Sequence, residues 1–189
     1  MTMPMRRTFV AIELPEGVKK DIGDVQKRLS GPGLRMADPG NLHLTIKFIG
    51  DWEEGALAGL CAAVGRAAAS VPAFGFSLGG VGAFPNLSRP HVVYIACSDD
   101  PPGSFRALHE AVESELVPLG IRREGRVFKP HLTLARVKEG RERPDLEDAL
   151  RRFGGYEGGG ADASELAVVL SELTREGPIY TRAGTLPLG

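Results

Sequence analysis

Two copies of one short pattern dominate the sequence: HLTIKFI at residues 43–49 and HLTLARV at residues 131–137. Each copy is rich in β-branched and apolar residues, which favours a β-strand. Because side chains alternate along a strand, the histidine and the threonine two positions later share one face, and the leucine between them takes the other. The sequence therefore predicts two strands, each presenting an imidazole beside a hydroxyl above an apolar face.

The elements around the two copies also recur in the same order. Apolar residues spaced by three and four predict helices, which cover residues 18–29, 57–68, 104–116 and 146–153. Short β-branched or apolar runs predict further strands, at residues 8–14, 74–81, 91–97, 165–173 and 180–188. Segments rich in glycine and proline predict loops, at residues 31–40 and 154–160.

This repetition, with the two histidines 88 residues apart, predicts a duplicated α+β fold. We expect a single domain over residues 1–189 with two lobes, each an antiparallel sheet with helices. The internal repeats cover approximately residues 6–82 and 90–173, and one motif per lobe faces a central cleft. The alternative architecture is one mixed α/β sheet, whose parallel order would not explain the repeated triplet.

Composition limits the classes of protein that the chain can represent. The formal net charge is −1, so no overall positive field attracts nucleic acid, and any polyanion must be held by a local patch. The two cysteines show no metal-binding or disulfide spacing, which fits a reducing compartment. The N-terminal apolar run is too short for a signal peptide, and no run approaches the length of a membrane span. We expect a cytoplasmic monomer that does not bind a membrane.

The chemistry of the motifs points to acid–base catalysis on a phosphate. Histidine titrates near neutral pH, so one imidazole can act as a base while another acts as an acid. Threonine hydroxyls can donate hydrogen bonds to the non-bridging oxygens of a phosphate. We therefore expect His43 and His131 to be catalytic and Thr45 and Thr133 to bind phosphate. The sequence lacks the clustered ligands of a metalloenzyme, so we expect neither a metal nor a cofactor.

With these residues in view, the chain resembles the 2H phosphoesterase superfamily, and within it the RNA 2′,3′-cyclic phosphodiesterases, also called 2′-5′ RNA ligases. The matching stretches are RTFVAIELP (7–15), NLHLTIKFIG (41–50), FKPHLTLARV (128–137) and GPIYTRAGTLPL (177–188). The resemblance implies a two-lobed fold and hydrolysis of an RNA 2′,3′-cyclic phosphate end to a 2′-phosphate. It also implies that the chain can join or split 2′-5′ linkages.

Several cations are candidates for RNA contacts. Lys47 is expected on the face of the first histidine and threonine, and Arg136 on the face opposite the second pair. Arg136 also matches an arginine of the family. The densest basic segment precedes the second motif and comprises Arg122, Arg123, Arg126 and Lys129. Cations of this kind neutralise RNA phosphates, although such a charge run is equally typical of a solvated loop.

Three alternatives remain open. The same site could favour the reverse reaction and join 2′-5′ RNA ends, or it could hydrolyse a small cyclic nucleotide. A non-catalytic RNA-end-binding protein is the alternative from a different class, although binding alone does not require two titrating imidazoles. We assign His131 as the base that activates water and His43 as the acid. The repeat makes the two sides alike, so the sequence does not distinguish this order from its reverse.

Overall fold

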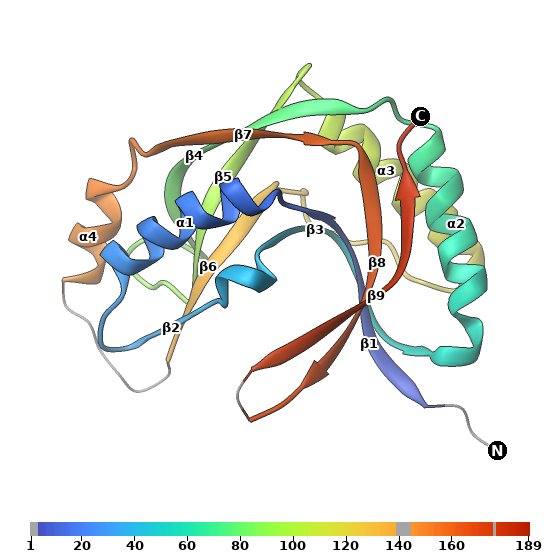
Figure 1. Cartoon of the computed structure of the whole chain (residues 1–189), viewed down its shortest axis with the longest axis horizontal. Coiled ribbons are helices and arrows are strands. Elements are labelled where there is room, and N and C mark those ends of the chain that lie inside the picture. The colour runs from blue at the N-terminus through green and yellow to red at the C-terminus, as the bar shows by residue number, and fades with distance from the viewer. Residues whose placement is uncertain (1–3, 139–144, 176) are drawn as a thin grey trace.

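The computed structural model describes residues 4–138, 145–175 and 177–189, within which helices lie against a strongly curved sheet (Figure 1). The strands are β1 (Met5–Glu13), β2 (Leu34–Met36), β3 (His43–Glu53), β4 (Phe74–Phe84), β5 (Val92–Asp100), β6 (His131–Val137), β7 (Glu157–Ala163), β8 (Glu165–Leu173) and β9 (Pro178–Pro187). The α-helices are α1 (Glu16–Leu29), α2 (Leu57–Ala69), α3 (Ser104–Leu116) and α4 (Leu146–Arg152). Short 3-10 turns occupy residues 39–41, 54–56 and 117–119.

One continuous sheet runs through the molecule in the order β7-β4-β5-β6-β3-β1-β8-β9, and β2 pairs with β6 outside this path. Every strand pairing among the described residues is antiparallel. The α+β prediction is therefore confirmed, and the parallel alternative is wrong. The two halves of the sheet meet at β3 and β6, the strands that carry the motifs.

The helices lie at the two ends of the curved sheet, with α1 and α4 at one end and α2 and α3 at the other (Figure 1). Their apolar stripes pack on a core that includes the apolar face of both motif strands. Leu44 and Leu132, which separate each histidine from its threonine, are fully buried in this core. Burial of the leucine face fixes which side of each strand the histidine and threonine take.

Two predicted loops contain short strands. The segment 31–40 contains β2, and the segment 154–160 overlaps the start of β7. In β7, a Cβ on Gly158 would lie 3.0 Å from the backbone oxygen of Leu78, and one on Gly160 would lie 3.1 Å from the oxygen of Phe76. These glycines allow β7 to approach β4 closely. Because the segment is rich in glycine, its composition alone predicts a loop there.

None of the helices in the described part of the chain is both long and apolar enough to cross a membrane. The proposed duplication of residues 6–82 and 90–173 stays a prediction, and residues 1–3, 139–144 and 176 of the expected domain lie outside the described residues.

Candidate active site

The two motifs meet at the centre of the sheet. Leu44 of β3 is paired with Leu132 of β6 in antiparallel register. Continuing this register by one residue in each direction sets His43 across from Thr133, and Thr45 across from His131. Because the two leucines point into the core, both histidines and both threonines point to the opposite face. One surface of the sheet thus carries two imidazoles and two hydroxyls from segments far apart in the sequence.

A β-bulge follows each threonine. On β3, Ala11 faces Thr45 and Val10 faces Lys47, so Ile46 is the extra residue. On β6, Tyr94 faces Thr133 and Val93 faces Ala135, which leaves Leu134 as the extra residue. A bulge shifts the alternation of side chains by one position.

Because of this shift, the residue five positions after each histidine points into the cleft. In β3 this residue is Phe48, and in β6 it is Arg136; both line the same cleft as the histidines. Lys47 is turned to the core face instead.

The imidazole of His43 is held by the turn that precedes its strand and by two aromatic rings. Its Nδ1 lies 2.7 Å from the carbonyl oxygen of Asn41. A carbonyl can only accept a hydrogen bond, so Nδ1 carries the proton in neutral His43, and the lone pair lies on Nε2. Phe9 stacks on the ring at 4.7 Å between centroids, and Tyr180 meets it edge-on at 5.3 Å. The ring is thereby fixed in orientation as well as in tautomer.

His131 is held in a matching way. Its Nδ1 lies 2.6 Å from the carbonyl oxygen of Lys129, two residues earlier, as Asn41 is to the first histidine. Phe84 and Tyr94 both meet the imidazole edge-on, at centroid distances of 4.9 and 5.5 Å. The Nε2 atom again retains the lone pair. Both motif histidines therefore leave the same nitrogen available for proton transfer.

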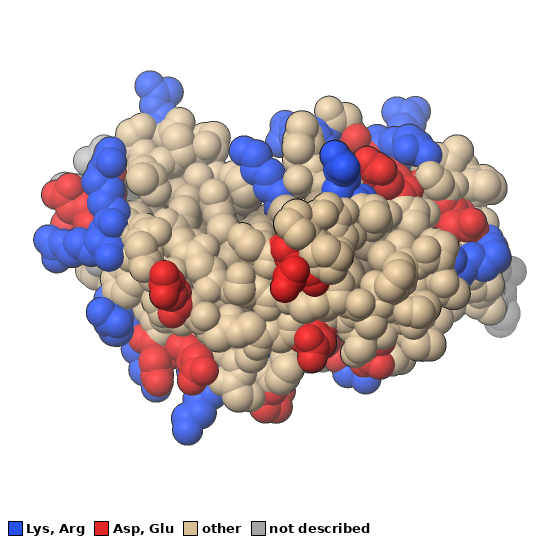
Figure 2. All heavy atoms as spheres, turned by 90° about the horizontal axis from the view of Figure 1, so that it is seen from above, with Lys and Arg blue, Asp and Glu red and all other residues tan. Residues whose placement is uncertain are grey.

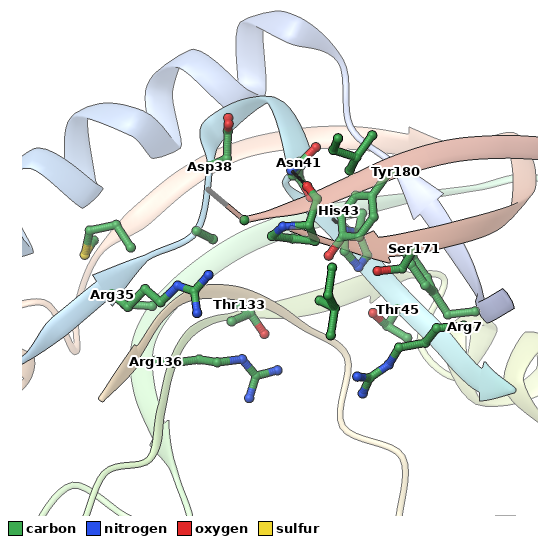
Figure 3. A pocket seen from close by; sticks show the side chains of 18 of the residues that line it. Arg7, Arg35, Asp38, Asn41, His43, Thr45, Thr133, Arg136, Ser171 and Tyr180 are labelled. Atoms are coloured by element: carbon green, nitrogen blue, oxygen red, sulfur yellow. Dashed lines mark hydrogen bonds between the residues drawn. The ribbon is translucent and has the colours of Figure 1, made fainter. Parts of the chain in front are cut away.

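A cleft of about 790 Å³ surrounds these side chains, which is a volume typical of ligand sites. Figure 3 shows His43 and Tyr180 on one side of the open space, with the two threonines below them. Three arginines border the space: Arg7 from β1, Arg35 from β2 and Arg136 from β6. No carboxylate of the described residues lies within ion-pair distance of these three guanidinium groups.

Burial and charge act on the titrating groups of the cleft. Burial lowers the pKa of His43, while the hydrogen bond to Asn41 and the charge of Glu13 oppose this effect. Burial raises the pKa of Tyr180, whereas Arg136 and Arg7 lower it. The free cleft is therefore positive where the arginines approach the tyrosine, and it favours a neutral imidazole at His43.

A family model described as the 2′-5′ RNA ligase superfamily matches residues 14–173 of this chain, which include both motifs. The chain belongs to the 2′-5′ RNA ligase superfamily. A relative from Methanothermobacter thermautotrophicus, named RNA 2′,3′-cyclic phosphodiesterase, is 35% identical over 177 residues that cover 93% of this chain and 95% of the relative. A relative of the same name from Aeropyrum pernix is 36% identical over 153 residues, which cover 80% of this chain and 84% of the relative.

Solved structures agree with this membership of the 2′-5′ RNA ligase superfamily. The Thermus thermophilus protein TT0787 superimposes with a TM-score of 0.81 at 29% identity, covering 96% of this chain and 97% of that chain. The E. coli protein LigT, in a complex with 3′-AMP, superimposes with a TM-score of 0.76 at 25% identity, covering 97% and 98%.

In this superfamily member, the predicted strand face is wrong for two cations, Lys47 and Arg136. Lys47 does not share the cleft face, because the bulge at Ile46 turns it into the core, where it is 2% exposed. Its Nζ lies 2.7 Å from a carboxylate oxygen of Glu113 and donates to the carbonyl of Arg122 at 3.0 Å. Arg136 was expected on the face opposite the second motif, but the bulge at Leu134 brings it into the cleft.

The basic segment before the second motif does not line the cleft of this superfamily member. Its four cations, Arg122, Arg123, Arg126 and Lys129, are exposed. The segment lies against α3 instead: Arg123 donates to Ser114, and Phe128 stacks on His109. The face seen in Figure 2 carries charges of both signs and no broad basic area. Among the residues that the structure describes, the cations that border the cleft are thus Arg7, Arg35 and Arg136.

Sequence reasoning missed two of these arginines. Arg7 lies in β1, just before the predicted start of that strand at residue 8, and β1 carries no motif; Arg35 lies in the segment expected to be a loop. The available signal for Arg7 was its place at the start of the first matching stretch, residues 7–15. Nothing in the pattern around Arg35 predicts β2, which is only three residues long.

Proposed function

We propose that this chain is an RNA 2′,3′-cyclic 3′-phosphodiesterase, which hydrolyses the cyclic phosphate at an RNA end to a 2′-phosphate. The observation that carries the proposal is the matched pair of imidazoles. His43 and His131 have Nδ1 bonded to a backbone carbonyl, line one cleft, and lie beside Thr45 and Thr133. The relatives named RNA 2′,3′-cyclic phosphodiesterase support the same activity.

The proposed reaction is an in-line displacement at phosphorus. One imidazole takes a proton from water through Nε2 while the water oxygen bonds to phosphorus. The bond between phosphorus and the 3′-oxygen breaks, and the second imidazolium donates its proton to that oxygen. The products are a 2′-phosphate and a free 3′-hydroxyl. Positioned groups of this kind each contribute roughly 10²–10⁴-fold to the rate.

The other cleft residues stabilise the phosphate in this proposal. Thr45 and Thr133 donate hydrogen bonds from their hydroxyls to the non-bridging oxygens. Arg136, on the cleft face next to the second motif, adds a positive charge to the same cleft. These donors are fixed before the reaction by the paired strands, and a preorganised donor stabilises the charge that develops in the transition state. The reaction as written needs no metal and no cofactor.

The burial of the His43 imidazole bears on the role of this histidine. We keep His131 as the base and His43 as the acid. Burial lowers the pKa of His43, which opposes this order in the empty cleft, whereas the negative charge of a bound phosphate favours the imidazolium. A substrate with sulfur in place of the 3′-bridging oxygen separates the roles, because a leaving thiolate needs little protonation.

On the sulfur substrate, His43→Ala should regain most of its lost activity, and His131→Ala should not. Recovery of His131→Ala instead would reverse the two roles.

The proposal is tested by steady-state hydrolysis of a short RNA that ends in a 2′,3′-cyclic phosphate. His43→Ala and His131→Ala should each lower kcat by about 10²–10⁴-fold or more. Thr45→Ala and Thr133→Ala should cost less, because each removes one hydrogen-bond donor. Circular dichroism should show folded protein in each case, since these side chains face the cleft. Near-normal turnover in either histidine variant would contradict the two-histidine mechanism.

We also propose that the protein works as a cytoplasmic monomer. Cys61 and Cys97 are both free thiols, as a reducing compartment allows. Burial raises the pKa of Cys97 to about 12, which keeps this thiol protonated and unreactive. Light scattering during gel filtration measures the mass, and a mass near 20.2 kDa is expected.

A further inference from the structure

Two arginines face each other at one side of the cleft. Arg35 of β2 and Arg136 of β6 are direct partners in the antiparallel pairing of these strands. Both side chains are exposed and line the cleft, and Figure 3 shows them side by side near Thr133. Like charges directly opposite each other on paired strands destabilise a sheet. Unless an anion compensates the two positive charges, this pairing therefore lowers the stability of the sheet.

No acidic residue in the described part of the chain supplies that anion. Other exposed arginines of this protein do have carboxylate partners: Arg66 pairs with Glu115 at 2.8 Å, and Arg151 pairs with Glu147. Arg35 and Arg136 have no such partner among the described residues. An unpaired arginine is ordinary on a convex surface, but here two of them converge on one concave site.

The backbone beneath this arginine pair is tightly fixed. The buried side chain of Gln26 reaches from α1 and donates to two carbonyls, that of Ala37 at 2.8 Å and that of Leu134 at 3.0 Å. The N–H of Ala37 also donates to the carbonyl of Leu134, at 2.8 Å. Leu134 is the bulge residue that turns Arg136 into the cleft. One glutamine thus holds both β2 and the bulge in the geometry that brings the arginines together.

The arginine pair begins beside the reacting centre and extends away from it. Arg136 is close enough to Tyr180 to lower its pKa, and Tyr180 contacts the ring of His43. Arg35 lies on β2, which pairs with β6 at residues 135–137, further along β6 than the pairing of β3 at Leu132. An anion held between the two guanidinium groups would therefore be adjacent to the reacting phosphate but separate from it.

We propose that Arg35, together with Arg136, binds a second phosphate group of the substrate, the one on the 5′-oxygen of the terminal nucleotide. The inference rests on the proposed function. An RNA end with a 2′,3′-cyclic phosphate carries only one other phosphate on that nucleotide, at its 5′-oxygen. The planar guanidinium forms paired hydrogen bonds with phosphate oxygens, so two facing arginines suit a phosphodiester. The preferred substrate class is then an RNA strand or a 5′-phosphorylated nucleotide, and a nucleoside 2′,3′-cyclic phosphate is a poor substrate.

The test compares two small substrates that differ in one group: adenosine 2′,3′-cyclic phosphate with and without a 5′-phosphate. Wild-type kcat/KM should be higher for the 5′-phosphorylated substrate. A hydrogen-bonded contact with a charged group supports a difference of roughly 10- to 100-fold. Arg35→Gln should remove most of this difference and leave kcat/KM for the unphosphorylated substrate nearly unchanged. Arg106→Gln, which removes the same charge from an exposed position of α3, is the matched control and should keep the difference.

Two results would overturn the inference. Equal kcat/KM values of the wild-type protein for the two substrates would mean that it has no subsite for the 5′-phosphate. An equal loss by Arg35→Gln on both substrates would place Arg35 on the reacting phosphate instead.

Calorimetry separates this inference from the proposed function, because it measures binding without turnover. Adenosine 2′,5′-bisphosphate should bind more tightly than adenosine 2′-monophosphate, and Arg35→Gln should abolish the advantage. If wild-type protein hydrolyses neither substrate yet shows this pattern, the proposed function fails and the anion site stands. If it hydrolyses the cyclic phosphate but binds the two ligands equally, the second-phosphate site is wrong and the proposed function stands.

Discussion

Lys47 offers a sharp test of the structure, because sequence and structure assign it different roles. The motif pattern places it in the cleft as a phosphate contact, whereas the structure buries it in an ion pair with Glu113. The Nζ···Oε1 distance is 2.7 Å, and the two side chains are 2% and 5% exposed. Lys47→Met keeps most of the side-chain length and removes the charge. It leaves the carboxylate of Glu113 buried, with the N–H of Glu124 at 3.2 Å and Nε2 of His109 at 3.5 Å as its remaining close contacts.

Removing one partner of a buried ion pair costs about 3–5 kcal/mol, because the other charge is left uncompensated. For a chain of this length, each 1 kcal/mol lowers Tm by about 2–4 °C, so Lys47→Met should lower Tm by roughly 6–20 °C. Adding Glu113→Gln removes the orphaned charge and keeps an acceptor for the Glu124 N–H. The double variant should therefore recover a large part of the loss, a non-additivity typical of residues in contact.

Urea denaturation followed by circular dichroism measures the differences in the free energy of unfolding as shifts of the denaturation midpoint at constant slope. The control is Lys27→Met, because Lys27 pairs with Asp24 at 2.8 Å but is 80% exposed. Such surface pairs contribute about 0–1 kcal/mol. The reasoning fails if Lys47→Met is as stable as wild type and instead raises KM for RNA.

Two further predictions concern metal and pH. Hydrolysis should persist in excess EDTA, because two imidazoles supply the acid and the base, and the described residues contain no group of three or more His, Cys, Asp or Glu that could hold a metal ion. Complete loss on chelation, restored by zinc or manganese, would contradict this. The pKa of His43 should lie below its ordinary value of 6.5 in an NMR titration, with Nδ1 protonated in the neutral form. The unfolded chain binds this proton near pH 6.5 and the folded chain only at lower pH. The contribution of His43 to stability should therefore decrease as pH falls below 6.5, and level off below the folded pKa. A midpoint at or above 6.5 would contradict the burial of this imidazole.

The sequence predicted the motif faces well, because strand alternation and the buried leucines allow one arrangement. That reasoning held for His43, Thr45, His131 and Thr133, which line one cleft. It failed immediately after each threonine. A bulge needs no distinctive residue, and the bulges at Ile46 and Leu134 have ordinary strand formers as their extra residues.

The missed cleft residues had a different cause. Arg7 and Arg35 reach the site from strands without a motif, so only the pairing of those strands with β3 and β6 brings them near the histidines. Pairing between distant segments is a property of the whole fold. The basic segment at residues 122–129 was misleading for the same reason, because proximity to His131 in sequence did not place it in the cleft.

The central claim is that the two histidines open a cyclic phosphate with departure of the 3′-oxygen. The most direct measurement is to incubate the purified protein with a short RNA that ends in a 2′,3′-cyclic phosphate and to identify the terminal group of the product. The account predicts a 2′-phosphate, which resists a phosphatase specific for 3′-phosphates, and no product with His43→Ala or His131→Ala on the same timescale. A dominant 3′-phosphate, or an unchanged cyclic end after treatment with the wild-type protein, would contradict it.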